Sequence, residues 1–233
     1  MTLEKRLKRY TRILSKDETP KIAKILADIP RDARVMEVGS GFGGKMEMLR
    51  GLGFADVLGV EKNPDSVALS RSKGLKAVTL EEFEAHPPAE KADLLVLSHI
   101  IEHLPPYEVV DLMEYYLAHL RLGGHVLIIS PVFHPHFYLD LDHVKPYYPQ
   151  SIKVFFGKND EQIAYYSPFR LKLRDVYFCK KSYRIKMRRS LLLKQRRGLA
   201  LHFLNLLLAL AFKGSFKLIG QTNSWAALFE KKE

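Results

Sequence analysis

The feature of the sequence that most constrains the fold is a regular alternation of short apolar stretches and helical stretches between residues 34 and 130. Residues 94–97 are all apolar, which is typical of a parallel strand that helices cover on both sides of its sheet. Repeated strand and helix units of this kind predict a doubly wound α/β sheet. Strands are expected at 34–38, 56–60, 75–79, 93–98 and 125–130, and helices at 43–52, 64–73 and 106–120, with a short acidic turn after residue 79.

The segments on either side of this alternation complete the predicted architecture. Apolar residues at helical spacing predict two leading helices, at 3–14 and 20–29. The later sequence predicts a loop at 131–150, a helix at 149–156, a strand at 171–179, a helical stretch at 185–212 and a last strand at 224–231. We therefore expect a seven-stranded, mainly parallel sheet, with N-terminal helices in 1–30, one main domain in 31–233, and a helical insertion at 180–220 before the last strand.

The charge of the chain is unevenly distributed. The formal net charge is +11, and residues 170–197 hold twelve Lys and Arg against one acidic residue. Residues 1–24 hold eight against three, whereas residues 25–169 hold thirteen against twenty. Two basic segments on a mildly acidic body indicate a polyanionic partner, either RNA or anionic lipid, unless they are ordinary solvated faces.

Cysteine content and hydropathy restrict the compartment. Cys179 is the only cysteine, so an internal disulfide and a cysteine zinc knuckle are both excluded. The first 20 residues lack the apolar core of a secretory signal, and no apolar run reaches the roughly 18 residues of a spanning helix. We expect a cytoplasmic protein.

The most specific motif is the run VMEVGSGFGG at residues 35–44. It follows a predicted strand and opens a predicted helix, where glycines allow unusual backbone angles and close approach to a ligand. The spacing of Gly39, Gly41 and Gly44 also satisfies the G-x-G-x-x-G pattern of dinucleotide-binding proteins. The run therefore predicts a nucleotide site, and the surrounding sequence must select the cofactor.

The surrounding sequence resembles the class I S-adenosylmethionine-dependent methyltransferases. Their first motif is an acidic residue followed two positions later by G-x-G-x-G, and later stretches of this chain, LGVE at 58–61, DLLVLSHIIEHL at 93–104 and GGHVLI at 123–128, are similar to further family motifs. The resemblance implies a Rossmann-like fold, S-adenosyl-L-methionine as cofactor, and a carboxylate at Glu61 that accepts hydrogen bonds from both ribose hydroxyls. The cofactor-binding residues that it implies are Glu37, Gly39, Ser40, Gly41, Gly43, Glu61, Lys62, Leu80, Glu81, Ser98 and His99.

One position departs from the family pattern. The family commonly has an acidic residue after the third strand that faces the adenine amino group, but this chain reads VTLEE at 78–82. Either Glu81 serves from a shifted position or a backbone contact replaces the acidic residue.

A base is needed if the methyl acceptor is a hydroxyl, and histidine suits that task because its unperturbed pKa is about 6.5. His99, His103, His136 and His143 follow the fourth and fifth predicted strands, and we select His103, His143 and Asp142 as the catalytic candidates. A structural role for these histidines is the alternative. Convergence on a divalent metal is a further alternative for His134, His136, Asp140, Asp142 and His143, but their spacing matches no closed metal motif, so no metal ligands are assigned.

A second resemblance concerns the acceptor. The run DHVKPYYPQSI at 142–152 looks like a His-Val-Arg-Pro-Tyr-x-Pro stretch of methyltransferases in surface-glycan and O-antigen biosynthesis, with Lys145 in place of Arg. That subgroup also commonly has a basic, apolar helical insertion before the last strand. The resemblance implies O-methylation of a sugar hydroxyl on a glycan or lipid-linked saccharide. An RNA methyltransferase, a small-lipid or quinone methyltransferase, and a non-catalytic cofactor-binding adaptor remain alternatives.

The insertion itself suggests where the protein acts. Basic residues between 180 and 197 precede the apolar run 199–212, which is too short to span a bilayer but suits the interface of an anionic membrane. We expect residues 180–212 to contact such a surface, with the protein peripheral on the inner face of the membrane. A buried core helix and a homodimer face are the alternatives.

Overall fold

The computed structural model describes residues 2–15, 18–134, 137–157, 167–185 and 195–233. Its elements divide into two compact units. The sheet unit consists of Ile22–Tyr177 and Trp225–Glu233, and the α1–α8 unit consists of Met1–Lys21 and Phe178–Ser224. Segments that are far apart in the sequence therefore pack together in both units.

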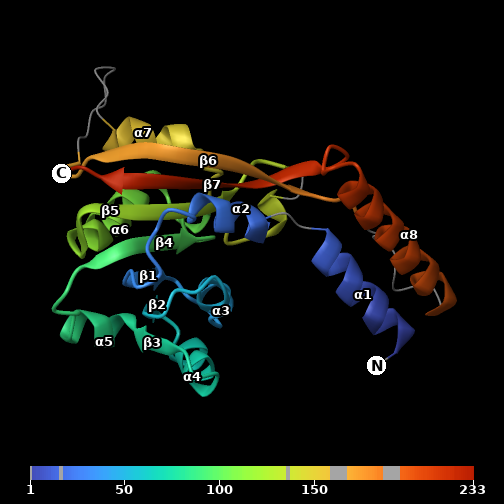
Figure 1. Ribbon diagram of the computed structural model, residues 1–233, viewed down its shortest axis with the longest axis horizontal. Helices are drawn as coiled ribbons and strands as arrows, with labels where there is room; N and C mark the ends of the chain where they lie inside the picture. Colours follow the sequence, from blue (N-terminus) through green and yellow to red (C-terminus); the bar gives the residue numbers. More distant parts are fainter. Residues whose placement is uncertain (1, 16–17, 135–136, 158–166, 186–194) are drawn as a thin grey trace. The chain divides into compact units, whose positions relative to one another are not determined.

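Seven strands form one sheet in the order β3-β2-β1-β4-β5-β7-β6 (Figure 1). Strands β1 to β5 pair in parallel. The C=O of Arg170, just before β6, accepts a hydrogen bond from the N–H of Lys232, just after β7, and the N–H of Arg170 donates one to the C=O of Glu233, so these two strands run antiparallel. The predicted fold class, a doubly wound and mainly parallel seven-stranded sheet, is confirmed. The strands are β1 Val35–Val38, β2 Val57–Glu61, β3 Lys76–Thr79, β4 Ala92–Ser98, β5 Leu120–Pro131, β6 Leu171–Lys181 and β7 Gln221–Lys231.

Helices flank the sheet, and most begin where the sequence predicts. Helix α4 shows the local reason, since the side chain of Asn63 accepts a hydrogen bond from the backbone N–H of Asp65 and Pro64 occupies the first turn. The helices are α1 Leu3–Leu14, α2 Glu18–Ile25, α3 Gly44–Gly51, α4 Pro64–Ser72, α5 Leu80–Ala85, α6 Pro106–Ala118, α7 Pro149–Phe156 and α8 Gln195–Gly214, with 3-10 turns η1 Ile101–His103 and η2 Phe137–Leu139.

Three local predictions need correction. The acidic turn expected after residue 79 is helix α5, because Thr79 and Glu82 form a reciprocal capping box at its start. Strand β5 begins at Leu120 rather than at 125, and its register with β4 shifts between Ala92 and Leu94. The helical stretch predicted at 185–212 is α8, which extends to Gly214, while residues 186–194 lie outside the described residues.

The strand order creates a crevice at one edge of the sheet. From β1 the chain continues to β2 and β3 on one side, whereas β4 and β5 are added on the other side. Loops that follow β1 and β4 therefore diverge at the carboxyl ends of these strands, which is where open α/β sheets bind ligands. Strand β1 is buried along its whole length, so the loop that follows it has a rigid base.

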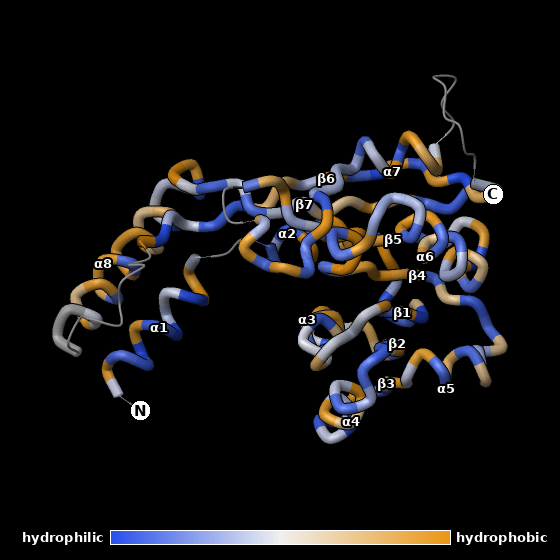
Figure 2. Tube along the Cα trace, turned by 180° about the vertical axis from the view of Figure 1, so that it is seen from behind, coloured by the Kyte–Doolittle hydropathy of each residue, from blue (hydrophilic) through white to orange (hydrophobic). Residues whose placement is uncertain are grey.

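In the α1–α8 unit, two helices from opposite ends of the chain lie together. The Glu4 carboxylate lies 3.3 Å from the His202 ring, and Asn205 exchanges hydrogen bonds with the backbone N–H and C=O of Ile185. Hydrophobic residues recur along α8 (Figure 2). None of the helices in the described part of the chain is long and apolar enough to cross a membrane.

Candidate active site at the carboxyl edge of the sheet

The loop between β1 and α3 depends on glycine. Gly39, Gly41 and Gly43 all have positive φ angles, of 64°, 52° and 77°. A Cβ at Gly39 would lie 2.4 Å from the Ile100 side chain, and one at Gly43 would lie 2.3 Å from Leu75. A Cβ at Gly41 would meet nothing within 4 Å. Two of the glycines are thus required by packing as well as by backbone angle, whereas Gly41 leaves open space beside the loop.

Glu61, the last residue of β2, is fixed beside this loop. Its Oε2 accepts a hydrogen bond of 2.8 Å from the backbone N–H of Gly41, and its Oε1 accepts one of 2.9 Å from Asn63. A carboxylate has about four acceptor positions, so two remain for a ligand. The backbone contacts hold the carboxylate in one orientation, which prepares it to receive a vicinal diol.

Glu37 lies within β1, beneath the loop. It is only 2% exposed, and its Oε2 has no hydrogen-bond partner among the described residues. Burial raises the pKa of Glu37 to about 8, because desolvation outweighs the attraction of Lys45 and the hydrogen bond from the Met46 backbone. Glu37 therefore supports the glycine loop from below instead of lining the cavity.

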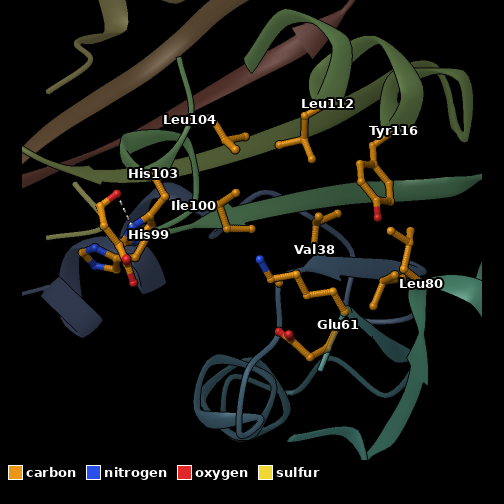
Figure 3. A pocket seen from close by; sticks show the side chains of 13 residues that line it. Val38, Glu61, Leu80, His99, Ile100, His103, Leu104, Leu112 and Tyr116 are labelled. Atoms are coloured by element: carbon orange, nitrogen blue, oxygen red, sulfur yellow. Dashed lines mark hydrogen bonds between the residues drawn. The ribbon is translucent and has the colours of Figure 1, made fainter. Parts of the chain in front are cut away.

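A cavity of about 590 Å³ opens between the glycine loop, Glu61 and the segment after β4. Figure 3 shows that its two ends differ: His99 and His103 lie at one end, Leu80 and Tyr116 lie at the other, and Glu61 lies between them. The volume falls within the 300–1,000 Å³ range of small-molecule and cofactor sites. Its lining is Val38, Gly39, Val60, Glu61, Lys62, Leu80, His99, Ile100, His103, Leu104, Leu112, Tyr116 and Asp142.

The histidine end is built by two loops that backbone contacts hold together. The C=O of Glu102 accepts hydrogen bonds from the backbone N–H groups of Val144, at 2.8 Å, and Lys145, at 3.3 Å. Nδ1 of His103 lies 3.2 Å from the C=O of Asp142. These contacts seat the run 142–147 against the segment after β4, so that the rings of His103 and His143 lie 4.9 Å apart.

The carboxylate of Glu102 organises this end from within the core. Glu102 is fully buried, and its Oε1 lies 3.1 Å from Nδ1 of His99 while its Oε2 accepts a hydrogen bond of 3.3 Å from Ser130. His99 has a positive φ of 58°, which is uncommon for a residue with a side chain. A strained histidine that a buried carboxylate holds at the mouth of a cavity is a feature of functional sites.

The predicted site residues fall into three groups. Gly39, Glu61, Lys62, Leu80, His99, His103 and Asp142 line the cavity. Ser40, Gly41, Gly43 and Glu37 form or support the loop, and the ring of His143 packs against that of His103 without lining the cavity. Ser98 ends β4, and Glu81 is exposed on the first turn of α5, and neither lines the cavity. Of the other metal candidates, His136 lies outside the described residues.

Several important residues were not predicted. Leu112 and Tyr116 reach the cavity from α6, and Glu102 lies beneath its histidine end. Helical periodicity marks Tyr116 as buried, but it does not reveal that its buried face borders a cavity. In the sequence, Glu102 stands in the Glu-His-Leu run, and only the adjacent His103 was assigned a chemical role.

Comparisons with known proteins identify the family of the chain. Residues 7–167 match the methyltransferase domain family. A search of curated protein sequences found no match.

Solved structures share the fold. One is a SAM-dependent methyltransferase from Archaeoglobus fulgidus, with 20% identity, a TM-score of 0.54, and coverage of 91% of this chain and 94% of that one. Another is the N-methyltransferase NodS from Bradyrhizobium japonicum, with 12% identity, a TM-score of 0.56, and coverage of 93% and 95%. A third is the magnesium protoporphyrin IX methyltransferase of Synechocystis with bound SAH, with 11% identity, a TM-score of 0.56, and coverage of 91% and 81%.

The raised pKa of Glu37 predicts a pH-dependent stability. Between pH 4.5 and about 8 the unfolded chain releases this proton while the folded chain keeps it, so the contribution of Glu37 to the free energy of unfolding falls as pH rises. Glu37→Gln has no ionisable group at this position, so this pH-dependent loss of stability is absent from the variant. The stability of the variant relative to the wild type should therefore rise by about 3 kcal/mol between pH 5 and pH 8, as measured by urea denaturation.

The matched control is Glu81→Gln, which removes an exposed carboxylate that folding does not desolvate. It should keep the pH dependence of the wild type. Parallel stability curves for Glu37→Gln and the wild type would show that Glu37 is ionised in the folded protein.

Proposed function

Since the chain belongs to the methyltransferase domain family, we propose that it transfers a methyl group from S-adenosyl-L-methionine to a hydroxyl group of a saccharide. The observation that carries the proposal is the division of one cavity into an apolar end, a fixed carboxylate and a histidine end. The first two suit the cofactor, and the third suits an acceptor that must lose a proton.

The residues present fit the cofactor. Adenine is a flat apolar ring, and Leu80, Leu112 and Tyr116 offer a matching apolar surface. Glu61 has acceptor capacity left for the ribose diol, and Gly41 leaves open space beside the loop. When bound, the cofactor would supply a methyl group on a positively charged sulfur. The acceptor oxygen would bond to the methyl carbon as the carbon–sulfur bond breaks, S-adenosylhomocysteine would leave, and the hydroxyl proton would pass to His103 or Asp142. Placing adenine and ribose in this way leaves the histidine end for the acceptor.

The histidine end suits a hydroxyl acceptor. His103 and Asp142 are side chains there that line the cavity and are able to take a proton. The chain's contribution to the rate is to hold the acceptor oxygen in line with the methyl group, an effect worth up to about 7–11 kcal/mol. The saccharide is supported by the resemblance of the run 142–152 to glycan methyltransferases, because Asp142, the first residue of this run, lines the cavity at its histidine end.

The cofactor assignment predicts selective stabilisation. S-adenosylhomocysteine should raise the melting temperature of the protein by mass action, whereas NAD should not. Glu61→Ala should weaken S-adenosylhomocysteine binding by about 1–3 kcal/mol, because the ribose hydroxyls lose a charged acceptor. Calorimetric titration measures this loss, with Asp111→Ala, which removes an exposed carboxylate of α6, as the control. Stabilisation by NAD alone would refute the cofactor assignment.

The acceptor assignment predicts a separate effect on turnover. His103→Ala should lower the rate of methyl transfer to a lipid-linked saccharide by about 10²–10⁴-fold, while the affinity for S-adenosylhomocysteine barely changes. His86→Ala replaces an exposed histidine at the end of α5 and should retain wild-type turnover. A loss of less than threefold in His103→Ala would remove this histidine from the reaction.

We further propose that the α1–α8 unit binds an anionic membrane surface. Leu199, Phe203, Leu207 and Leu210 are exposed and recur at helical spacing along α8. The turn that follows α8 exposes more apolar surface, including Phe216, which is 90% exposed. An apolar face of this kind suits insertion at a lipid interface.

The charges of the same unit support lipid as the partner. Helix α1 carries Lys5, Arg6, Lys8, Arg9 and Arg12, and the sequence 186–194, which lies outside the described residues, adds further basic residues. Each Lys or Arg near an anionic surface contributes about 1 kcal/mol. The combination of basic side chains with exposed apolar ones favours lipid over RNA, because RNA binding does not call for the apolar component.

Liposome sedimentation tests the membrane proposal. The protein should bind vesicles that contain phosphatidylserine and not vesicles of phosphatidylcholine alone. Phe203→Ser combined with Leu207→Ser should weaken binding at least tenfold although no charge is removed. Leu122→Ser, which removes an exposed apolar side chain of β5, should have no effect. RNA binding at physiological salt without vesicle binding would favour an RNA methyltransferase, and concentration-dependent self-association lost in the double variant would favour a homodimer face.

A further inference from the structure

Three potential metal ligands meet at the histidine end of the cavity. Glu102, His103 and His143 each offer one ligand atom, and these atoms all lie within 4.8 Å of one another. Three tetrahedral ligands, each about 2.1 Å from an ion, are about 3.4 Å apart. Side-chain movements that bring the ligand atoms closer by up to about 1.4 Å would therefore place all three on one ion.

In both imidazoles, a backbone carbonyl lies beside one of the two ring nitrogens. Nδ1 of His103 faces the C=O of Asp142 at 3.2 Å, and Nδ1 of His143 faces the C=O of Phe137 at 2.9 Å. A carbonyl oxygen only accepts hydrogen bonds, so in the neutral tautomer that fits this contact Nδ1 carries the proton and Nε2 keeps the lone pair that a metal needs. A backbone carbonyl that fixes the second nitrogen in this way is the usual arrangement around a metal-binding histidine. Nε2 of His143 also lies 3.8 Å from Oδ2 of Asp140, which is beyond hydrogen-bond distance.

Glu102 supplies the negative charge. Its carboxylate is fully buried, with contacts to His99 and Ser130 that orient both oxygens. Burying a carboxylate is costly unless cations or several donors compensate it. A divalent cation would provide that compensation, while His99 and Ser130 would act as the surrounding groups that hold the carboxylate in place.

We propose that Glu102, His103 and His143 bind a divalent first-row transition metal, such as Mn²⁺, Co²⁺ or Zn²⁺. Two imidazoles and one carboxylate suit these ions, whereas Mg²⁺ and Ca²⁺ prefer oxygen ligands. Sets of two histidines and one carboxylate leave coordination positions open. Because His103 also lines the cavity, an ion held here is able to bind an oxygen of the acceptor, a role that rests on the proposed function.

A metal site would give His103 and His143 roles that differ from that of a general base acting alone. With a metal on its Nε2, His103 would position the acceptor as a ligand, and Asp142 would be the group that takes the hydroxyl proton. His143, which does not line the cavity, would gain a direct role. The ligands come from two loops that the Glu102 carbonyl already ties together. Metal binding would therefore use a structure that exists before the ion arrives.

Titration of the full chain with Co²⁺ tests the proposal, using protein that carries no histidine tag and has been dialysed against a chelator. Calorimetry and the visible absorption of Co²⁺ should show one ion per chain, and Mg²⁺ should bind far more weakly. His103→Ala, His143→Ala and Glu102→Gln should each weaken Co²⁺ binding at least tenfold. His86→Ala should bind as the wild type does. Retained S-adenosylhomocysteine binding would confirm that each variant is folded.

The outcomes separate this site from the proposed function. Absence of 1:1 Co²⁺ binding, or equal binding by the three variants and the wild type, would overturn the metal site even if saccharide methylation is observed. Specific Co²⁺ binding that these variants lose would support the site even if no saccharide accepts a methyl group, in which case only the acceptor proposal would fail.

Discussion

The active-site region depends on the backbone carbonyl of Glu102. By accepting hydrogen bonds from Val144 and Lys145, it ties the loop after β5 to the segment after β4. The hydroxyl of Tyr147 adds a hydrogen bond of 2.8 Å to the C=O of Leu104, and Nε1 of Trp225 on β7 donates one of 2.7 Å to the C=O of Tyr147. Two runs that lie about forty residues apart in the sequence are thus joined beside the cavity and anchored to strand β7.

Much of the fold and of the cofactor end was predictable from sequence, for a simple physical reason. Carboxyl ends of parallel strands meet at one edge of the sheet, so residues that follow β1, β2, β3 and β4 must converge once the strands are assigned. Gly39, Glu61, Leu80 and His99 converge in this way. Each of these residues lies within a few residues of a strand end, so the strand assignment was enough to predict that they lie close together.

The parts that escaped prediction depend on contacts that sequence spacing does not express. Helix α5 was missed because the capping signal at Thr79 and Glu82 was interpreted as part of an acidic turn. Tyr116 was missed because helical periodicity predicts only that this side of α6 is buried, and does not distinguish a cavity from the packed hydrophobic core. The expected metal candidates lay within one loop, whereas the cluster in the structure joins His143 to Glu102 and His103 across two loops. The spacing of residues within one loop does not reveal this cluster, because the Glu102 carbonyl brings its residues together from two loops.

The central claim is that the histidine end of the cavity presents a saccharide hydroxyl to the methyl donor. The most direct measurement is transfer of a radiolabelled methyl group from S-adenosylmethionine into an extract of the organism that encodes the protein, separated afterwards into RNA, glycan-lipid and small-molecule fractions. We predict that the label enters the glycan-lipid fraction as a base-stable ether on a sugar. Label that enters RNA, with none in the glycan-lipid fraction, would contradict the claim.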